Sequence, residues 1–313
     1  MKVGTLLALD SVFKEKEWII DETNELSLYS RASNLYEKLE EQEKEVLLII
    51  LEKMQYYTIN NYEDLLVKCL LEMLEKYGNK EKYKFTPILQ DKNKLGLKLI
   101  FERKRNEASN CIKITPAFNA HNKFLDIKSS MFVAYLLKSN TLQYHEKIAK
   151  MKINTSYYYT DEDIKNINNK KQKLVLIDDF IGTGDTALEA IKSLTNRGLN
   201  QDKIKVLSLI CLESGYEKIK ESNIDIYTGK IIKSVPKLLS EDKWNEKAID
   251  KFEKTIISIS EKVDPFAKHD NILGYGKSFS LVSMIRTPNN VPDFLWNNKK
   301  NNEMVIFPRF SKG

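Results

Sequence analysis

The sequence predicts an α/β protein, with a parallel-sheet core that follows an N-terminal helical region. Apolar residues recur at helical spacing from about residue 11 to residue 77, and beyond residue 174 short apolar runs alternate with helical stretches. Strands that alternate with helices build parallel sheets. The charged run 78–82 separates these two sequence patterns, so we expect a helical region over residues 1–80 and an α/β domain over residues 81–313.

The N-terminal region is expected to hold three helices. Their apolar faces span residues 28–39, 46–54 and 65–74. Asn60 followed by Glu63 resembles a capping box that starts the third helix, and Gly78 is typical of a helix end. No catalytic pattern occurs here, so we expect this region to serve internal packing or to bind a protein partner.

The middle of the chain has a mixed pattern. Residues 85–89 and 96–101 predict two strands joined by a turn, and residues 112–114 predict a third short strand. Residues 131–137 are apolar throughout. Their periodicity fits a buried strand and the start of a helix equally well.

The last part of the chain alternates regularly. We expect helices over residues 186–196, 215–221 and 244–261, and strands over residues 205–212, 224–226 and 278–285. A glycine turn at residues 274–276 precedes the last of these strands, and residues 287–290 carry a Thr-Pro-Asn-Asn turn signal.

Residues 174–186 carry the clearest chemical signal in the chain. Four apolar residues suit a strand buried on both faces, and Asp178 and Asp179 stand where that strand is expected to end. A loop of glycines and threonines then leads into a helix. In parallel sheets, ligands bind beyond the carboxyl ends of the strands. Loop N–H groups and a helix N-terminus bind phosphate, so we expect an anion site with two acids beside it.

The segment from Val175 to Thr186 resembles the phosphoribosyl pyrophosphate (PRPP) motif of type I phosphoribosyltransferases. That motif is a hydrophobic strand, two acids, two apolar residues and a Thr/Gly loop. An ordinary strand–loop–helix turn with a capping threonine is the alternative. The resemblance implies a type I phosphoribosyltransferase-like core, PRPP as a substrate and Mg²⁺ as a cofactor. The tail, through residues 274–276, 287–290 and 307–309, is similar to phosphoribosyltransferase-like proteins of bacterial conflict and anti-phage systems.

The resemblance also implies roles for individual residues. Asp178 and Asp179 would be the catalytic acids, binding the ribose hydroxyls directly or through magnesium, although Asp179 could instead cap the loop. The 5-phosphate of PRPP would be bound by the loop residues Gly182, Thr183, Gly184, Asp185 and Thr186.

Two positions of this loop are informative. In transferases for 6-oxopurines, the residue that matches Gly182 is usually an acid and the proposed base, so glycine argues against such an enzyme. Asp185 places an acid inside a phosphate loop. We therefore expect its side chain to face solvent or to cap the following helix.

Other parts of the family's site are assigned less directly. Lys128, within residues 127–130, is our candidate for the pyrophosphate loop, and a plain surface role fits it equally. Residues 154–160 lie where the family closes a flexible loop over PRPP, with a solvated loop as the alternative. The acceptor is expected to bind in a hood beyond the core sheet, where residues 274–276 resemble a turn of purine transferases.

The composition argues against several other classes of protein. Hydrophobic residues make up 42% and charged residues 30% of the chain, which is typical of a globular protein. No apolar run is long enough to cross a bilayer, so no membrane contact is expected. Three isolated cysteines favour a reducing cytoplasm, and three scattered histidines show no zinc spacing. The net charge of +6 permits an anionic substrate or nucleic acid and indicates neither.

We therefore expect a PRPP-dependent phosphoribosyltransferase that moves ribose 5-phosphate to an unassigned acceptor and releases pyrophosphate. The tail suggests a bacterial defence effector or accessory enzyme. A PRPP- or nucleotide-sensing module without catalysis, and a scaffold that docks a partner through its helices, are the alternatives.

Overall fold

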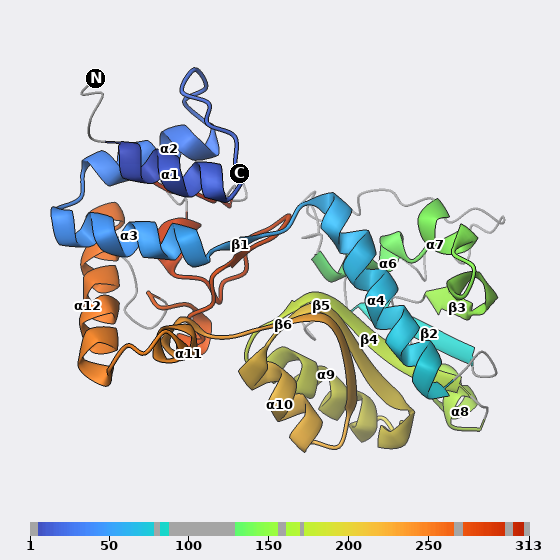
Figure 1. The fold of residues 1–313 in the computed structure, drawn as a ribbon. Helices are drawn as coiled ribbons and strands as arrows, with labels where there is room; N and C mark the ends of the chain where they lie inside the picture. Colours follow the sequence, from blue (N-terminus) through green and yellow to red (C-terminus); the bar gives the residue numbers. More distant parts are fainter. Residues whose placement is uncertain are drawn as a thin grey trace, which may run out of the picture. The chain divides into compact units, whose positions relative to one another are not determined.

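The computed structural model describes residues 6–77, 82–87, 129–155, 161–169, 172–265, 272–297 and 303–309. The chain forms two compact units (Figure 1). One unit combines Met1–Thr58 with Lys233–Gly313, and the other is the continuous segment Ile59–Ile232.

The continuous unit is built on a five-stranded parallel sheet. The strands lie in the order β3-β2-β4-β5-β6. Their bounds are Lys82–Pro87 for β2, Lys152–Thr155 for β3, Gln172–Ile181 for β4, Ile204–Leu212 for β5 and Asp225–Ile232 for β6. Every residue of β5 is buried, as expected for an inner strand covered by helices on both faces. The sheet therefore confirms the predicted parallel α/β architecture.

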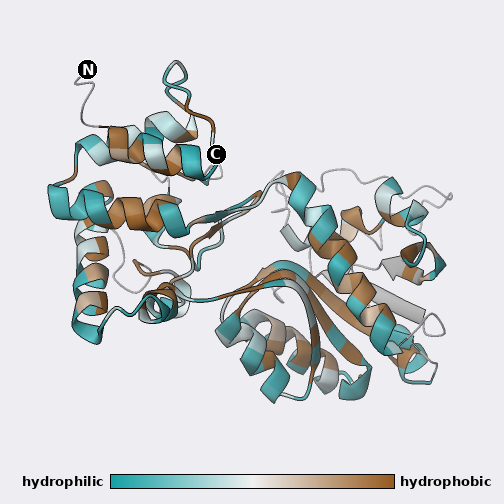
Figure 2. Ribbon diagram, viewed as in Figure 1, coloured by the Kyte–Doolittle hydropathy of each residue, from teal (hydrophilic) through white to brown (hydrophobic). Residues whose placement is uncertain are grey.

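Three helices pack on one face of this sheet. They are α8 (Asp161–Asn169), α9 (Asp185–Asn196) and α10 (Glu213–Glu221). Leu174 and Val206 of the sheet join Ile191 of α9 and Ile219 of α10 in one buried apolar cluster. Figure 2 shows the hydrophobic residues running along the strands between the covering helices. Burial of this cluster fixes α9 and α10 against this face of β4 and β5.

Two further helices, α4 (Ile59–Tyr77) and α6 (Ser129–Leu136), also pack on the sheet. The first packs on β5 and β6, and the second on β2 and β4. A Cβ atom on Gly229 of β6 would lie 2.8 Å from Leu65 of α4, so this close approach requires glycine. The short elements α7 (Asn140–Tyr144), η1 (Ile148–Lys150) and η2 (Gln201–Lys203) complete the described part of this unit.

The discontinuous unit is mainly helical. Its helices are α1 (Leu7–Glu15), α2 (Leu28–Glu37), α3 (Glu41–Lys53), α11 (Val235–Glu241) and α12 (Glu246–Val263). Two-residue strands β1 (Gln55–Tyr56) and β7 (Val282–Ser283) pair in parallel, and η4 (Tyr275–Lys277) and η5 (Asp293–Leu295) are short 3₁₀ turns. Segments from the two ends of the chain thus share one core.

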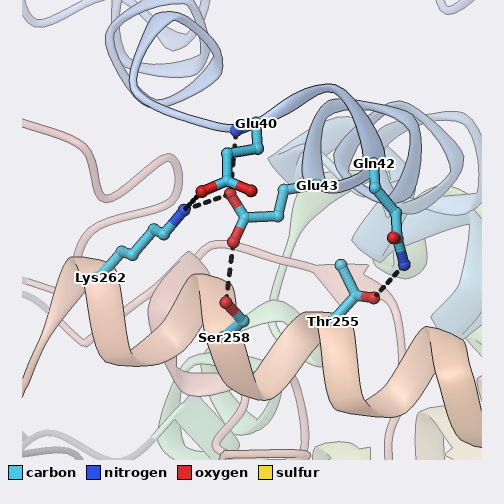
Figure 3. Close-up of polar contacts among 6 residues, drawn as sticks. All are labelled: Glu40, Gln42, Glu43, Thr255, Ser258 and Lys262. Carbon is cyan, nitrogen blue, oxygen red and sulfur yellow. Dashed lines mark hydrogen bonds and ion pairs between the residues drawn. The ribbon is translucent and has the colours of Figure 1, made fainter.

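Polar contacts join α3 to α12 across that core (Figure 3). The buried carboxylate of Glu43 accepts hydrogen bonds from Lys262 Nζ at 2.6 Å and from Ser258 Oγ at 2.8 Å. It also accepts one from the backbone N–H of Glu40 at 3.0 Å, at the start of α3. A buried carboxylate with several donors is satisfied rather than reactive, so this cluster serves packing.

Most predicted helices and strands are confirmed, with three differences. The third N-terminal helix begins at Ile59, so Asn60 lies inside its first turn rather than at its cap. Residues 131–137 fall in and just after α6, which settles the open choice in favour of a helix. The predicted strand 278–285 was wrong, because only Val282–Ser283 pair as a strand. The predicted strands 96–101 and 112–114 lie outside the described residues.

The grouping of segments differs from the boundary predicted at residue 80. Helix α4 belongs with the sheet, and residues 233–313 belong with the N-terminal helices. The assignment of residues 1–80 and 81–313 as the two domains stays a prediction. Among the residues that the structure describes, no helix has the length and apolarity needed to span a bilayer.

Candidate functional site

Strand β4 carries both candidate acids within its length. We expected the strand to end at Asp178, but it continues to Ile181, since Phe180 and Ile181 still pair with Ile210 and Cys211 of β5. The acids therefore lie within the carboxyl half of β4, the central strand of the sheet, rather than at its end.

The strand loses its regular alternation at these acids. Leu174, Leu176 and Ile181 join the same apolar cluster, although the odd spacing from 176 to 181 would put them on opposite faces of a regular strand. The pairing offset to β5 is the same before and after Asp179, so the strand changes face without an inserted residue. The change of face falls between Leu176 and Ile181, in the stretch that contains both acids.

Asp179 is buried and held by the protein. Its side chain is 4% exposed, and its Oδ2 accepts a hydrogen bond from the hydroxyl of Tyr62 at 3.3 Å. Its Oδ1 accepts the backbone N–H of Phe180 at 3.0 Å. Tyr62 comes from α4 and also packs edge-on against Phe132 of α6. Two helices thus fix the position of one acid.

Asp178 is less enclosed than its neighbour. Its side chain is half-buried, and its Oδ1 accepts the backbone N–H of Asp179 at 3.0 Å. A half-buried carboxylate is reachable by a ligand. Asp178 is therefore the more accessible of the two acids.

The loop that follows β4 leads directly into α9. Gly184 occupies the N-cap position with φ +81°, a conformation that favours glycine. Asp185 is the first helical residue, and Thr186 beside it is exposed. The N–H groups of the first turn have no intrahelical partners and carry the positive end of the helix dipole. This geometry can bind an anion.

Helix α10 presses against this loop through a glycine. A Cβ atom on Gly215 would lie 2.1 Å from the carbonyl oxygen of Gly182 and 3.1 Å from the amide nitrogen of Gly184. Real side chains do not approach backbone atoms so closely, so Gly215 is what allows α10 to support the loop. Sequence reasoning missed this contact, because Gly215 and Gly182 lie in different elements.

Asp185 faces α10 rather than the interior of the loop. Its Oδ2 accepts a hydrogen bond from Thr183 Oγ1 at 2.7 Å, and its Oδ1 forms an ion pair with Lys218 of α10. The hydrogen bond from Lys218, with that from Thr183, holds the pKa of Asp185 below its ordinary value. The expected helix-capping role is not seen, since the carboxylate binds a side chain on each oxygen.

The acid pair is compatible with one magnesium ion. The described residues contain no group of three or more His, Cys, Asp and Glu that could hold a metal by themselves. Magnesium needs only one or two carboxylates when substrate oxygens and water complete its shell. Asp178 offers a reachable carboxylate, whereas both oxygens of Asp179 already accept hydrogen bonds from the protein.

The other parts of the predicted site are only partly described. Lys128 is outside the described residues, and only Ser129 and Ser130 of the predicted pyrophosphate loop are described, as the start of α6. Of residues 154–160, the first two end β3 and the rest lie outside the described part. The turn at residues 274–276 belongs to the other unit.

Comparison with known proteins gives two matches. A family model described as PRTase-CE, where PRTase abbreviates phosphoribosyltransferase, matches residues 33–309. The uracil phosphoribosyltransferase of Staphylococcus carnosus (strain TM300) is 37% identical over 57 residues, which are 18% of this chain and 26% of that protein. The chain therefore spans about a quarter of the length of that curated relative.

Proposed function

Because the chain belongs to the PRTase-CE family, we propose that it transfers ribose 5-phosphate from PRPP to an acceptor nucleophile and releases pyrophosphate. The observation that carries this proposal is the acid pair of β4 followed by a glycine loop and the N-terminus of α9. The 37% identity to part of a uracil phosphoribosyltransferase supports the same chemistry.

The reaction places separate demands on the site. The bond between C1 of the ribose and the diphosphate breaks, the electron pair leaves with the diphosphate, and C1 develops oxocarbenium character before the acceptor attacks. Catalysis therefore requires a fixed 5-phosphate, charge stabilisation near the ribose and a waiting nucleophile.

The residues of the site would meet the first two demands. The loop 182–186 would bind the 5-phosphate through its N–H groups and the hydroxyl of Thr186, since the single O–H of Thr183 is donated to Asp185. Asp178 would bind a ribose hydroxyl and a magnesium ion, and Asp179, positioned by Tyr62, would bind the second hydroxyl and stabilise positive charge on the ring. Magnesium, when bound, would neutralise charge on the departing diphosphate.

The test of this proposal is calorimetric titration with PRPP and Mg²⁺, followed by an assay of pyrophosphate release with candidate acceptors. We expect the wild type to bind PRPP and Asp178→Asn to bind it at least about tenfold more weakly, as for loss of about 1.4 kcal/mol. Asp264→Asn, in the helical unit, is a control of equal charge change. A wild type that does not bind PRPP would overturn the proposal.

The sensor alternative has a different outcome in the same experiment. The absence of an acid at Gly182 removes the base used by 6-oxopurine enzymes. A chain that binds PRPP through Asp178, yet releases no pyrophosphate with nucleobases, nucleotides, nucleic acid or protein, is a PRPP-sensing module.

The biological setting belongs to the same proposal. The resemblance of the tail to proteins of anti-phage systems suggests a defence effector or accessory enzyme acting in the bacterial cytoplasm, where PRPP is made. A host that expresses the wild type should resist phage better than one that expresses Asp178→Asn. Equal plating on both hosts would contradict the defence role without affecting the proposed chemistry.

A further inference from the structure

The proposed phosphate loop contains a negative charge of its own. Asp185 directly follows Gly184 and begins α9, beside the N–H groups that would bind the 5-phosphate. A phosphate monoester is largely a dianion at neutral pH. An unpaired carboxylate so close to it would weaken binding.

The structure pairs this carboxylate on both oxygens. Thr183 Oγ1 donates to one oxygen at 2.7 Å, and the ammonium of Lys218 contacts the other. Thr183 and Asp185 are thereby linked to each other and to α10. The side chain of Asp185 is directed toward the lysine, so its charge is opposed by a neighbouring positive charge.

The packing of helix α10 places that positive charge beside Asp185. Gly215 allows its backbone to lie against Gly182 and Gly184, and Lys218 follows three residues later, on the same face of the helix. The close glycine contact fixes the distance between helix and loop. The lysine is therefore held beside Asp185 by the packing of the helix, not by a flexible loop.

We infer that Lys218 is a positioning residue of the phosphate loop, whose ammonium neutralises Asp185 so that the loop accepts a dianionic 5-phosphate. This inference rests on the proposed function. It assigns to α10 a role in ligand binding and explains how an acid is tolerated at position 185.

Titration with ribose 5-phosphate tests this role, because that probe carries the 5-phosphate without the diphosphate. Lys218→Met should weaken binding about fivefold to tenfold at low ionic strength, and added salt should reduce the difference by screening the half-exposed pair. Lys218→Arg should bind like the wild type. Lys220→Met is the matched control, because Lys220 lies on the same helix over the ring of Tyr216 and should leave affinity unchanged.

The double variant distinguishes neutralisation from direct contact. Lys218→Met should have little effect in an Asp185→Asn background, since no charge is left to neutralise. Equal weakening in both backgrounds would overturn the inference, and so would wild-type affinity of Lys218→Met alone. If the weakened variant also unfolds several degrees earlier and Asp185→Asn does not restore binding, Lys218 has only a structural role. If the wild type binds neither ribose 5-phosphate nor PRPP, the proposed function itself is overturned.

Discussion

At the scale of single residues, the site depends on side chains that no local pattern reveals. Asp178, Asp179 and the loop 182–186 could be assigned from the sequence, because strand, acids, glycines and helix follow one another within 13 residues. Tyr62 could not, since it lies 117 residues before Asp179 and only the packing of α4 brings them together. Lys218 could be recognised only once α10 was known to contact the loop.

The first prediction concerns Tyr62. Tyr62→Phe keeps the ring packed against Phe132 but removes the donor to Asp179, leaving a buried carboxylate oxygen with one fewer partner. We expect the free energy of unfolding to fall by about 1 kcal/mol, less than is usual for a hydrogen bond to a charged group, because the bond is long at 3.3 Å. Affinity for PRPP should also fall, as measured by calorimetry.

Tyr57→Phe is the control for this substitution. Tyr57 donates to the neutral Gln55 Oε1 at 2.8 Å in the other unit, so its variant also loses one tyrosine hydroxyl hydrogen bond. Its affinity for PRPP should match the wild type. Equal loss of affinity in both variants would contradict a specific role of Tyr62 in positioning Asp179.

At the scale of elements, the regular parts were predictable and the irregular parts were not. Helices α2, α3 and α12 follow from their apolar periodicity alone. The predicted strand 278–285 failed because its serines do not face solvent in alternation. Ser278 is buried and donates to the carbonyl oxygen of Tyr275, three residues earlier, at 2.6 Å. Such local bonds compete with strand pairing.

The second prediction concerns the contact of α10 with the loop. Gly215→Ala would put a methyl group 2.1 Å from the carbonyl oxygen of Gly182, so the helix or the loop must move. We expect a loss of about 1–3 kcal/mol in the free energy of unfolding, as for other overpacked sites. We also expect weaker binding of ribose 5-phosphate, because the loop that would hold its phosphate is displaced. Ser214→Ala, at the exposed neighbouring position of α10, should change neither quantity. Normal binding by Gly215→Ala would show that the loop is not supported by this contact.

The third prediction concerns the contact of α3 with α12. Burial acts to raise the pKa of Glu43, but the hydrogen bonds from Lys262, Glu40 and Ser258 outweigh it and leave the pKa below the ordinary value of 4.5. A carboxyl whose pKa is lowered by folding stabilises the fold above its ordinary pKa, and this stability is lost as the pH falls through the lowered value. The free energy of unfolding of the wild type, measured with denaturant, should therefore fall as the pH drops below about 4.5.

Glu43→Gln isolates this contribution. The variant should be less stable than the wild type at neutral pH, and the difference should shrink as the pH falls below 4.5. Glu41→Gln removes the exposed partner of Lys44 in the same helix. This variant should lose stability with falling pH as the wild type does. A constant difference between Glu43→Gln and wild type from pH 7 to pH 3 would show that ionisation of Glu43 is not involved.

At the scale of the whole molecule, the division of the chain follows from which segments share a core. The sequence pattern changes near residue 80, but α4 buries Leu66 and Leu70 in the unit that contains the sheet. Residues 233–313 contribute α12 to the core of the N-terminal helices. Local composition cannot reveal that two ends of a chain pack together. The chain passes between its two units at residues 58–59 and again at 232–233.

The fourth prediction is that the two units lose structure separately. Leu47 in α3 and Leu209 in β5 are both fully buried, and replacing either with alanine should cost about 2–5 kcal/mol. Because each side chain lies in the core of a different unit, Leu47→Ala should speed backbone hydrogen exchange in α3 and α12 and leave β4 and β5 protected. Leu209→Ala should do the reverse. Exchange that rises in both units with either variant would show one cooperative core, and the phosphate loop would then depend on the helical unit for its stability.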